Sequence, residues 1–395
     1  MSAPPTHTCN ELAIPSISRG EIRGYRPELD AVRFLAFFLV FILHILTPTS
    51  VLYRNLSPRA EASYGHEWSI VITTVSLGLC LFFTLSAYLI TDLLLEEKRR
   101  RAVVSVSRFY VRRVLRIWPL YLLGIGIGIG IAAAQRRWTD VHGFVWYLFC
   151  AGNVYCGLFG WPESPMAPLW SISVEEQFYL VWPWAMRTFT KRGLIGCAMA
   201  FVIAANTALM ILSPRHPVSD YTIWVNSFVQ FEMFAAGILL VILKKNPERA
   251  NPIAGAGLVA AGLAVWIATI TVFEFERPPA GGNAESRAIL MLGFAAIATG
   301  SAVILHGFRV IGSAAIPRAV AYLGKISFGL YVFHVLTIDF ARVILLPLHG
   351  VTYLFSTALV AFVVAVAVSV ISYAYLESPF LRLKRKFEYL HSRPI

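Results

Sequence analysis

The stretch RFLAFFLVFILH, residues 33–44, carries a guanidinium and an imidazole at the two ends of ten apolar residues. At about 100° and 1.5 Å per residue, eleven helical steps bring Arg33 and His44 to one face, roughly 16 Å apart. Ionisable groups inside a long apolar segment need compensating partners and are functional candidates by default. His44 could act as a general base, because an imidazole exchanges a proton near neutral pH. Alternatively, His44 could hydrogen bond to a neighbouring helix, and Arg33 could pair with Asp30 or reach lipid phosphate.

The stretch APLWSISVEEQFYLVWP, residues 167–183, carries two adjacent carboxylates, Glu175 and Glu176. Adjacent helical side chains point about 100° apart, so at most one of the two faces a given cavity. An unpaired buried carboxylate is costly, which makes Arg33 or His44 a natural partner. One of the two carboxylates could instead cap the amino end of its helix.

Four arginines lie close together in RFYVRRVLRIWPLY, residues 108–121. Arg108, Arg112 and Arg116 share one helical stripe, and Arg113 lies beside them. Guanidinium groups match phosphate oxygens, so the cluster could hold a polyphosphate. Spacing alone favours the plainer function of fixing the membrane orientation and binding anionic lipid.

The elements that must position these residues are membrane-spanning helices. The chain has 395 residues, of which 57% are hydrophobic and 14% charged, and its mean hydropathy is +0.66. A soluble domain carries about 25% charged residues. The long apolar runs lack the alternating pattern of a β-barrel, so each run is expected to be a helix. We expect ten spans, at 31–50, 67–92, 117–134, 169–188, 194–213, 223–243, 252–273, 287–306, 320–346 and 352–376.

The segment 139–163 is apolar but interrupted by Gly, Asn and Pro, so we expect a re-entrant segment that returns to the same side. With ten spans, one side carries roughly three times as many Lys and Arg residues as the other, which marks the cytoplasmic side. Both termini are then cytoplasmic, and the net charge of +12 reflects orientation rather than nucleic-acid binding. We expect a disordered tail at 1–24, one transmembrane domain at 25–380 and a basic tail at 381–395.

Weaker candidates lie inside other expected spans. Ser86 and Glu232 are isolated polar residues, and Tyr331 and His334 are three residues apart on one helix face. Hydrogen bonding between helices is the simpler function for Ser86 and Tyr331. The repeat GIGIGIG at 124–130 predicts close helix packing, and no residue spacing indicates a metal site.

Several motifs, taken in their order, resemble those of the acyltransferase-3 family of integral membrane acyltransferases. The opening YRPELDAVRFLAFFLVFILH contains an arginine and a histidine separated by ten residues, as in that family. The resemblance runs from about residue 25 to 386. Its later landmarks are LFFTLSAYLI, FYVRRVLRIWPLY, LWSISVEEQFYLVWP, ISFGLYVFHVL and YLESPFLRLK.

The resemblance implies a ten-helix bundle that transfers an acyl group, usually acetyl, from cytoplasmic acyl-CoA to a hydroxyl. Acceptors in the family are mostly glycans of the cell envelope, including lipid-linked sugars, so the resemblance also implies the bacterial cytoplasmic membrane. It implies no metal and no nucleic-acid partner. The functional residues of the family correspond here to Arg33 and His44, to Arg113 and Arg116, and to Ser171, Glu175 and Glu176.

This resemblance gives an expected mechanism. The pantetheine arm would pass Arg33 and carry the thioester to the depth of His44. His44 would remove the proton of the acceptor hydroxyl, while Glu175, or less favourably Glu176, orients the imidazole. Acyl-CoA would dock with its phosphates held by Arg112, Arg113 and Arg116.

Two questions stay open in the sequence. An oxyanion donor is required in principle, and the nominees are Ser86, Trp170 and Tyr331. A transporter with an intramembrane relay of His, Arg and Glu is the alternative function, although the broken segment 139–163 has no counterpart in the second half of the chain. The substrate-binding candidates are Ser86, Trp170, Ser171, Tyr331 and His334.

Overall fold

The computed structural model describes residues 25–47, 68–213, 221–243, 250–272, 284–345 and 350–389. Throughout these residues the regular elements are helices, which confirms the expected all-α fold. The expected tail at 1–24 and the end of the basic tail, at 390–395, lie outside the described residues.

Eight helical stretches of the described chain are long and apolar enough to cross a membrane. Two further helices, α8 (Trp170–Thr188) and α11 (Ser227–Leu243), occupy the remaining expected spans. The protein is a polytopic membrane protein. The eight stretches contain α1 (Pro27–Leu46), α4 (Gly78–Arg101), α5 (Val106–Ala134), α9 (Lys191–Leu212), α12 (Pro252–Val272), α13 (Ala284–Ile311), α15 (Ser327–Ile344) and α16 (Gly350–Ser372).

The segment expected to be re-entrant forms two short helices, α6 (Trp138–Leu148) and α7 (Gly152–Phe159). With 11 and 8 residues, neither is long enough to cross a bilayer. The backbone between them finds a protein partner, because Gln177 of α8 donates a hydrogen bond to the carbonyl of Cys150 at 2.8 Å. The same amide donates to Asn153 at 2.9 Å. Such internal satisfaction is what non-helical backbone at membrane depth requires.

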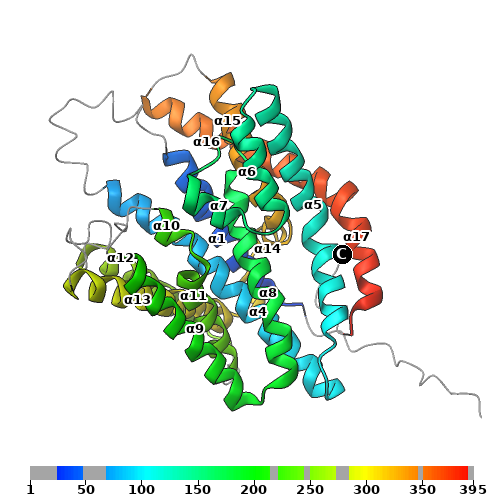
Figure 1. Ribbon diagram of the computed structural model, residues 1–395, viewed down its shortest axis with the longest axis vertical. Helices are drawn as coiled ribbons and strands as arrows, with labels where there is room; N and C mark the ends of the chain where they lie inside the picture. The colour runs from blue at the N-terminus through cyan, green and yellow to red at the C-terminus, as the bar shows by residue number, and fades with distance from the viewer. Residues whose placement is uncertain are drawn as a thin grey trace, which may run out of the picture.

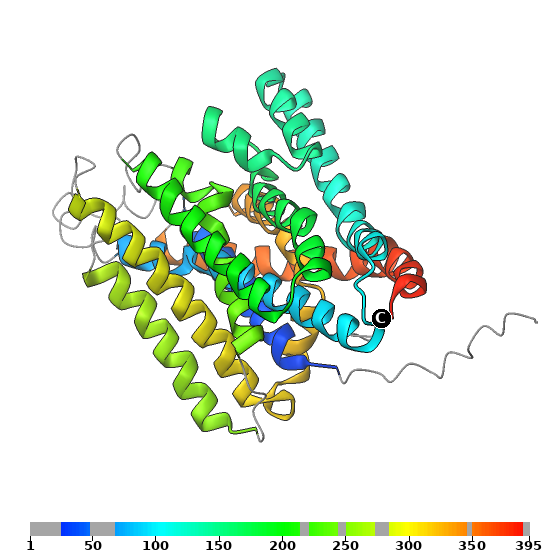
Figure 2. The ribbon, with the colours of Figure 1, turned by 60° about the horizontal axis from the view of Figure 1, so that its bottom comes forward.

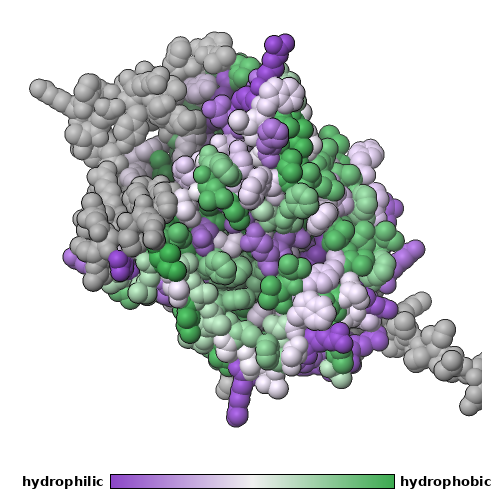
Figure 3. All heavy atoms as spheres, viewed as in Figure 1, coloured by the Kyte–Doolittle hydropathy of each residue, from purple (hydrophilic) through white to green (hydrophobic). Residues whose placement is uncertain are grey.

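The helices form one bundle with a central group of four and a flank on each side. In both ribbon views α9, α11, α12 and α13 lie on one side, and α5 and α17 (Ser378–Lys384) lie on the other (Figures 1 and 2). Helices α1, α4, α8 and α15 pack between these flanks. Hydrophobic residues cover much of the face in Figure 3, and hydrophilic residues gather over the α4–α5 turn and α17 at its lower right edge.

Two glycines allow the central helices to approach closely. A Cβ at Gly324 of α14 (Arg318–Lys325) would collide with the backbone carbonyl of Asp30 in α1. A Cβ at Gly237 of α11 would collide with the carbonyl of Thr84 in α4. The first contact holds α1, which carries Arg33 and His44, against α14, and the second holds α11 against α4.

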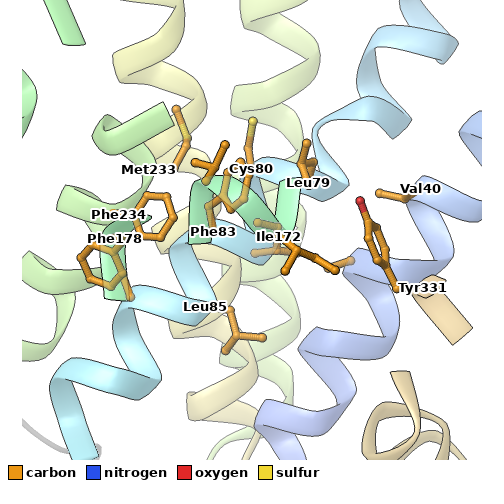
Figure 4. Close-up of a cluster of buried hydrophobic side chains, with 14 of the residues drawn as sticks. Val40, Leu79, Cys80, Phe83, Leu85, Ile172, Phe178, Met233, Phe234 and Tyr331 are labelled. Atoms are coloured by element: carbon orange, nitrogen blue, oxygen red, sulfur yellow. The ribbon is translucent and has the colours of Figure 1, made fainter. Parts of the chain in front are cut away.

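Aromatic side chains fill the space where α4, α8 and α11 meet. The ring of Phe234 lies 5.2 Å from that of Phe83 and 4.5 Å from that of Phe178, measured between centroids (Figure 4). All three side chains are fully buried. Offset aromatic pairs at these distances add to the stabilisation from burial, so this cluster fixes α8 relative to α4.

Candidate active site

A cavity of about 70 Å³ lies between α1, α4, α5, α8 and the start of α15. Three guanidinium groups line it, from Arg33 on α1 and from Arg113 and Arg116 on α5. Among the described residues that line it, Glu175 of α8 supplies the one carboxylate. Three positive charges against one negative charge suit an anionic ligand such as a phosphate.

Arg33 is held in place by its own helix. Its Nη1 lies 2.7 Å from Oδ1 of Asp30, one turn earlier, and the Asp30 side chain is only 1% exposed. This is the pairing expected for Arg33 from the i to i+3 spacing. The pairing orients the guanidinium, whose five N–H donors leave others free for the cavity.

Glu175 belongs to a hydrogen-bonded group at the same cavity. The hydroxyl of Tyr179 donates to Oε2 of Glu175 at 3.0 Å, because the i to i+4 spacing puts both on one face of α8. The hydroxyl of Ser86 on α4 contacts the Tyr179 hydroxyl. The other carboxylate oxygen of Glu175 is buried and has no partner in the described part of the chain. It is therefore available to a ligand or to water in the cavity.

Glu176 points elsewhere, as its adjacency to Glu175 predicts. Its Oε2 accepts a hydrogen bond from the indole of Trp118 on α5 at 3.3 Å. Glu176 does not line the cavity that contains Arg33. The two carboxylates therefore have different surroundings although they are neighbours in sequence.

The adjacent residues Arg112 and Arg113 on α5 also have different surroundings. The guanidinium of Arg113 lies 5.6 Å from the centroid of the Tyr179 ring at the cavity wall. Arg112 instead pairs with Glu97 of α4 at 2.8 Å and donates to the carbonyl of Phe387 at 3.1 Å. Both side chains of this ion pair are 3% exposed. Arg112 thus ties α5 to α4 and to the chain beyond α17, outside the arginine-lined cavity.

His44 lies near the other end of α1 against a second histidine. Its ring centroid is 5.0 Å from that of His334 on α15. The Nδ1 of His334 lies 2.6 Å from the backbone carbonyl of Tyr331, and a carbonyl only accepts, so Nδ1 carries the proton. The Nε2 of His334 is then an acceptor, and it is buried without a partner in the described part of the chain.

Tyr331 and Ser171 form a neighbouring polar pair. Their hydroxyl oxygens are 2.6 Å apart, and Tyr331 also donates to the carbonyl of Pro168 at 2.8 Å. Trp170, which follows Pro168 closely in the chain, packs its ring 5.9 Å from that of Trp161. Four of the nominated substrate-binding residues, Trp170, Ser171, Tyr331 and His334, therefore lie around the amino end of α8 and the facing part of α15. The fifth, Ser86, lies at the arginine-lined cavity instead.

One side of α1 presents both ends of the apolar stretch to α15. Ser327 at the start of α15 lines the cavity with Arg33, and His334 further along α15 faces His44. Between them, Phe82 lines the cavity and stacks on Tyr331 with centroids 6.1 Å apart. His44 is not among the residues lining that cavity, and ring contacts from Phe82 through Tyr331 and His334 connect the cavity to His44.

Three residues at the site were not singled out from the sequence. Tyr179 could have been found from its i to i+4 spacing to Glu175 on one helix face. Glu377 and Lys384 interact electrostatically with Arg116. They lie more than 250 positions from Arg116 in the chain, so this proximity could not be expected from the sequence. Glu377 ends a π-helical segment, Tyr373–Glu377, and such segments are frequent at functional sites. In the described residues no group of three His, Cys, Asp or Glu could hold a metal ion.

Residues 26–374 match the family model for the acyltransferase domain known as acyltransferase-3. This chain belongs to the acyltransferase-3 family. The match covers all the helices that carry the site, from the start of α1 into the π-helical segment. No solved structure matches the chain.

Curated relatives of this acyltransferase-3 protein carry names of O-acetyltransferases. The peptidoglycan O-acetyltransferase OatA of Listeria monocytogenes is 30% identical over 182 residues, which cover 43% of this chain and 25% of the relative. A Staphylococcus aureus protein named "Putative O-acetyltransferase" is 22% identical over 381 residues, or 90% of this chain and 57% of the relative. The chain therefore spans between a quarter and just over half of the length of these relatives.

Proposed function

We propose that this acyltransferase-3 protein is an O-acetyltransferase that moves an acetyl group from cytoplasmic acetyl-CoA to a hydroxyl of a cell-envelope glycan. The observation that carries the proposal is the arrangement along α1. Arg33 lies in an arginine-lined cavity, and His44 lies against His334 further along the same helix. The name of the Listeria relative supports a glycan of the cell wall as the acceptor class.

The donor would bind at the arginine-lined cavity. Arg113 and Arg116 would hold phosphate oxygens of acetyl-CoA, since guanidinium groups bind phosphate through paired hydrogen bonds. Arg112 contributes indirectly, because its buried ion pair with Glu97 holds the helix on which the other two arginines stand. Arg33 would meet the pantetheine arm, which would continue past the stacked rings of Phe82 and Tyr331 toward His44.

The transfer step would take place at His44. The acceptor oxygen attacks the thioester carbonyl carbon, so a C–O bond forms and the C–S bond breaks. His44 accepts the hydroxyl proton and then returns it to the departing CoA sulfur, which balances charge and protons. His334, rather than Glu175, would orient the imidazole, because its unprotonated Nε2 could accept a hydrogen bond from His44.

The oxyanion of the tetrahedral intermediate needs a donor near the reacting carbonyl. Tyr331 is favoured over Ser86, since it is next to His334 in space, with ring centroids 5.4 Å apart. Its hydroxyl, which donates to the carbonyl of Pro168, would have to turn toward the oxyanion to donate to it. Ser86 lies with Glu175 and Tyr179 at the arginine-lined cavity. Glu175 would there balance the charge of three guanidinium groups.

The proposal is tested with the purified chain in lipid nanodiscs. Release of CoA thiol from acetyl-CoA is measured with and without soluble peptidoglycan fragments, and the glycan is then analysed by NMR for O-acetyl groups. We expect thiol release that depends on the glycan and fails in His44→Ala. Glycan acetylation that persists in His44→Ala would contradict the assignment of the base, and movement of solute across sealed vesicles without acetyl transfer would favour a transporter.

The proposed reaction also requires a particular orientation of the protein in the membrane. We infer from the basic segments that both termini lie in the cytoplasm of a bacterial cell, so the arginine-lined cavity would face the compartment that holds acetyl-CoA. Fusion of a reporter that is fluorescent only in the cytoplasm to each terminus tests this topology. Fluorescence from both fusions is expected, and its absence from either would reverse the assignment.

A further inference from the structure

A second cavity lies among α9, α11, α12 and α13, away from the site described above. It is an open groove of about 690 Å³, within the range of about 300–1,000 Å³ typical of small-molecule sites. Its wall on α13 is built of small residues, among them Ala295 and Ala302, and its other walls are mostly leucine and valine. The cluster of Phe83, Phe178 and Phe234 lies on the opposite side of α11, so the groove is separate from the arginine-lined cavity.

One charged side chain forms part of this apolar wall. Glu232 of α11 lines the groove, is only 4% exposed, and its Oε2 has no hydrogen-bond partner in the described part of the chain. A buried carboxyl group without a partner is costly in an apolar environment. The hydrocarbon tails of surrounding lipid cannot supply the missing hydrogen bond. An occupant of the groove that brings a polar group to Glu232 would therefore be favoured over one that does not.

The groove is also elongated. Its lining runs from Glu232 to Leu243 on α11 and from Ala295 to His306 on α13, which is about 16 Å along each helix. Helix α12 comes between α11 and α13 in the sequence and carries the chain back across the bundle. Helices α11 and α13 therefore run in the same direction. Glu232 near the start of α11 and His306 near the end of α13 then lie at opposite ends of an apolar track.

We propose that this groove binds one long-chain lipid whose headgroup donates a hydrogen bond to Glu232. The headgroup chemistry is a hydroxyl or an ammonium, and the chain occupies the track between α11 and α13. The small residues on α13 provide the width for that chain, and the leucines on α11 provide its apolar contact. This inference goes beyond the proposed acetyl transfer and does not depend on it.

The experiment uses the full chain in nanodiscs of dioleoylphosphatidylcholine, whose headgroup has no hydrogen-bond donor. Two photoreactive probes are compared, a diazirine-bearing hexadecanol and its methyl ether, which differ only in the donor. Labelled peptides are mapped by mass spectrometry. We expect the alcohol to label the groove helices about fivefold more than the ether, which is the preference that one hydrogen bond gives.

Two variants distinguish the contribution of the headgroup contact from that of the apolar track. Glu232→Leu should label equally with both probes, and Ala302→Phe should lose labelling with either because it fills the groove. Leu359→Phe on α16, at a residue that is 65% exposed on another span, is the matched control and should behave as the native chain. Equal labelling of the native chain by both probes, or labelling spread evenly over all spans, would overturn the proposal.

Thermal unfolding gives a second and independent measurement. Replacing an unpartnered buried carboxyl group by leucine removes a desolvation penalty, so Glu232→Leu should unfold at the same or a higher temperature without probe. The alcohol should raise the unfolding temperature of the native chain and not of the variant. A lower unfolding temperature for Glu232→Leu would mean that Glu232 has a structural partner, and the lipid site would then be rejected.

Discussion

The imidazole of His44 on α1 lies 5.0 Å from the imidazole of His334 on α15, measured between ring centroids. His334 is 1% exposed, and the Tyr331 carbonyl fixes which of its nitrogens carries the proton. Glu175, the residue expected from the sequence to orient His44, instead hydrogen bonds to Tyr179 at the arginine-lined cavity. A neutral partner in an apolar environment can orient the base without placing a second charge beside it.

Loss of His334 should impair turnover without impairing donor binding. His334→Phe keeps the ring but removes the acceptor nitrogen, so we expect kcat to fall about 10²-fold, because small misplacements of reacting groups have effects of that size. The KM for acetyl-CoA should stay unchanged. Thr337→Val, one turn further along α15, removes only a hydroxyl bonded to its own helix and is the matched control. A rise in KM with unchanged kcat would assign His334 to substrate binding alone.

His44 itself should be indispensable for turnover. His44→Ala should insert and fold normally and lower kcat by about 10²–10⁴-fold, which is the usual contribution of a general base. Added free imidazole should restore part of the activity of this variant, because it can enter the space left by the ring. Restoration of activity by imidazole in His334→Ala but not in His44→Ala would exchange the assignments of the two histidines.

The arginines of α5 should divide into two groups. Arg113→Ala and Arg116→Ala should each raise the KM for acetyl-CoA about tenfold, the value of one charge-assisted hydrogen bond. Arg112→Ala should instead lower stability by about 3–5 kcal/mol, because it leaves Glu97 buried without its partner. Donor titrations and thermal unfolding separate these effects. A normal unfolding temperature and a raised KM for Arg112→Ala would place that arginine at the donor.

The two adjacent glutamates should also differ. Glu175→Gln keeps an oxygen that accepts from Tyr179 but removes the negative charge of the cavity lining, so the KM for acetyl-CoA should fall. Glu176→Gln is the matched control, since Glu176 bonds to Trp118 and does not line that cavity. Donor titration of both variants gives the comparison. A KM that rises in Glu175→Gln would show that the carboxylate contacts the donor directly.

The glycine repeat of α5 provides a prediction on stability. A Cβ at Gly128 would lie 2.5 Å from Cζ of Phe144, a fully buried ring, so Gly128→Ala should lower stability by about 1–3 kcal/mol. A Cβ at Gly130 has no neighbour within 4 Å, so Gly130→Ala should stabilise the helix by about 0.5–1 kcal/mol. Thermal unfolding in the same detergent measures both. Equal effects of the two substitutions would mean that α5 and α6 do not pack as described.

Much of the site follows from helical geometry in the sequence. The i to i+3 pair of Asp30 and Arg33 and the divergence of Glu175 from Glu176 were both predicted from angles along one helix. Such angles are local properties of the backbone, so they hold wherever the helix lies in the bundle.

Contacts between helices were not predictable in the same way. Arg112 and Arg113 are adjacent and chemically identical, and only the packed neighbours decide that one meets Glu97 while the other lines the cavity. The series of ring contacts from Phe82 through Tyr331 and His334 to His44 depends likewise on three different helices.

The sequence by itself determined the helical form of the membrane spans, since a bilayer leaves each apolar backbone segment no partner for its polar groups except its own turns. It also determined that Arg33 and His44 share one side of α1. The tertiary structure decided which helices face that side, and so made His334 the neighbour of His44. The reason is that lateral packing depends on how well side chains from distant parts of the chain fit together. The local periodicity of a sequence contains no information about that fit.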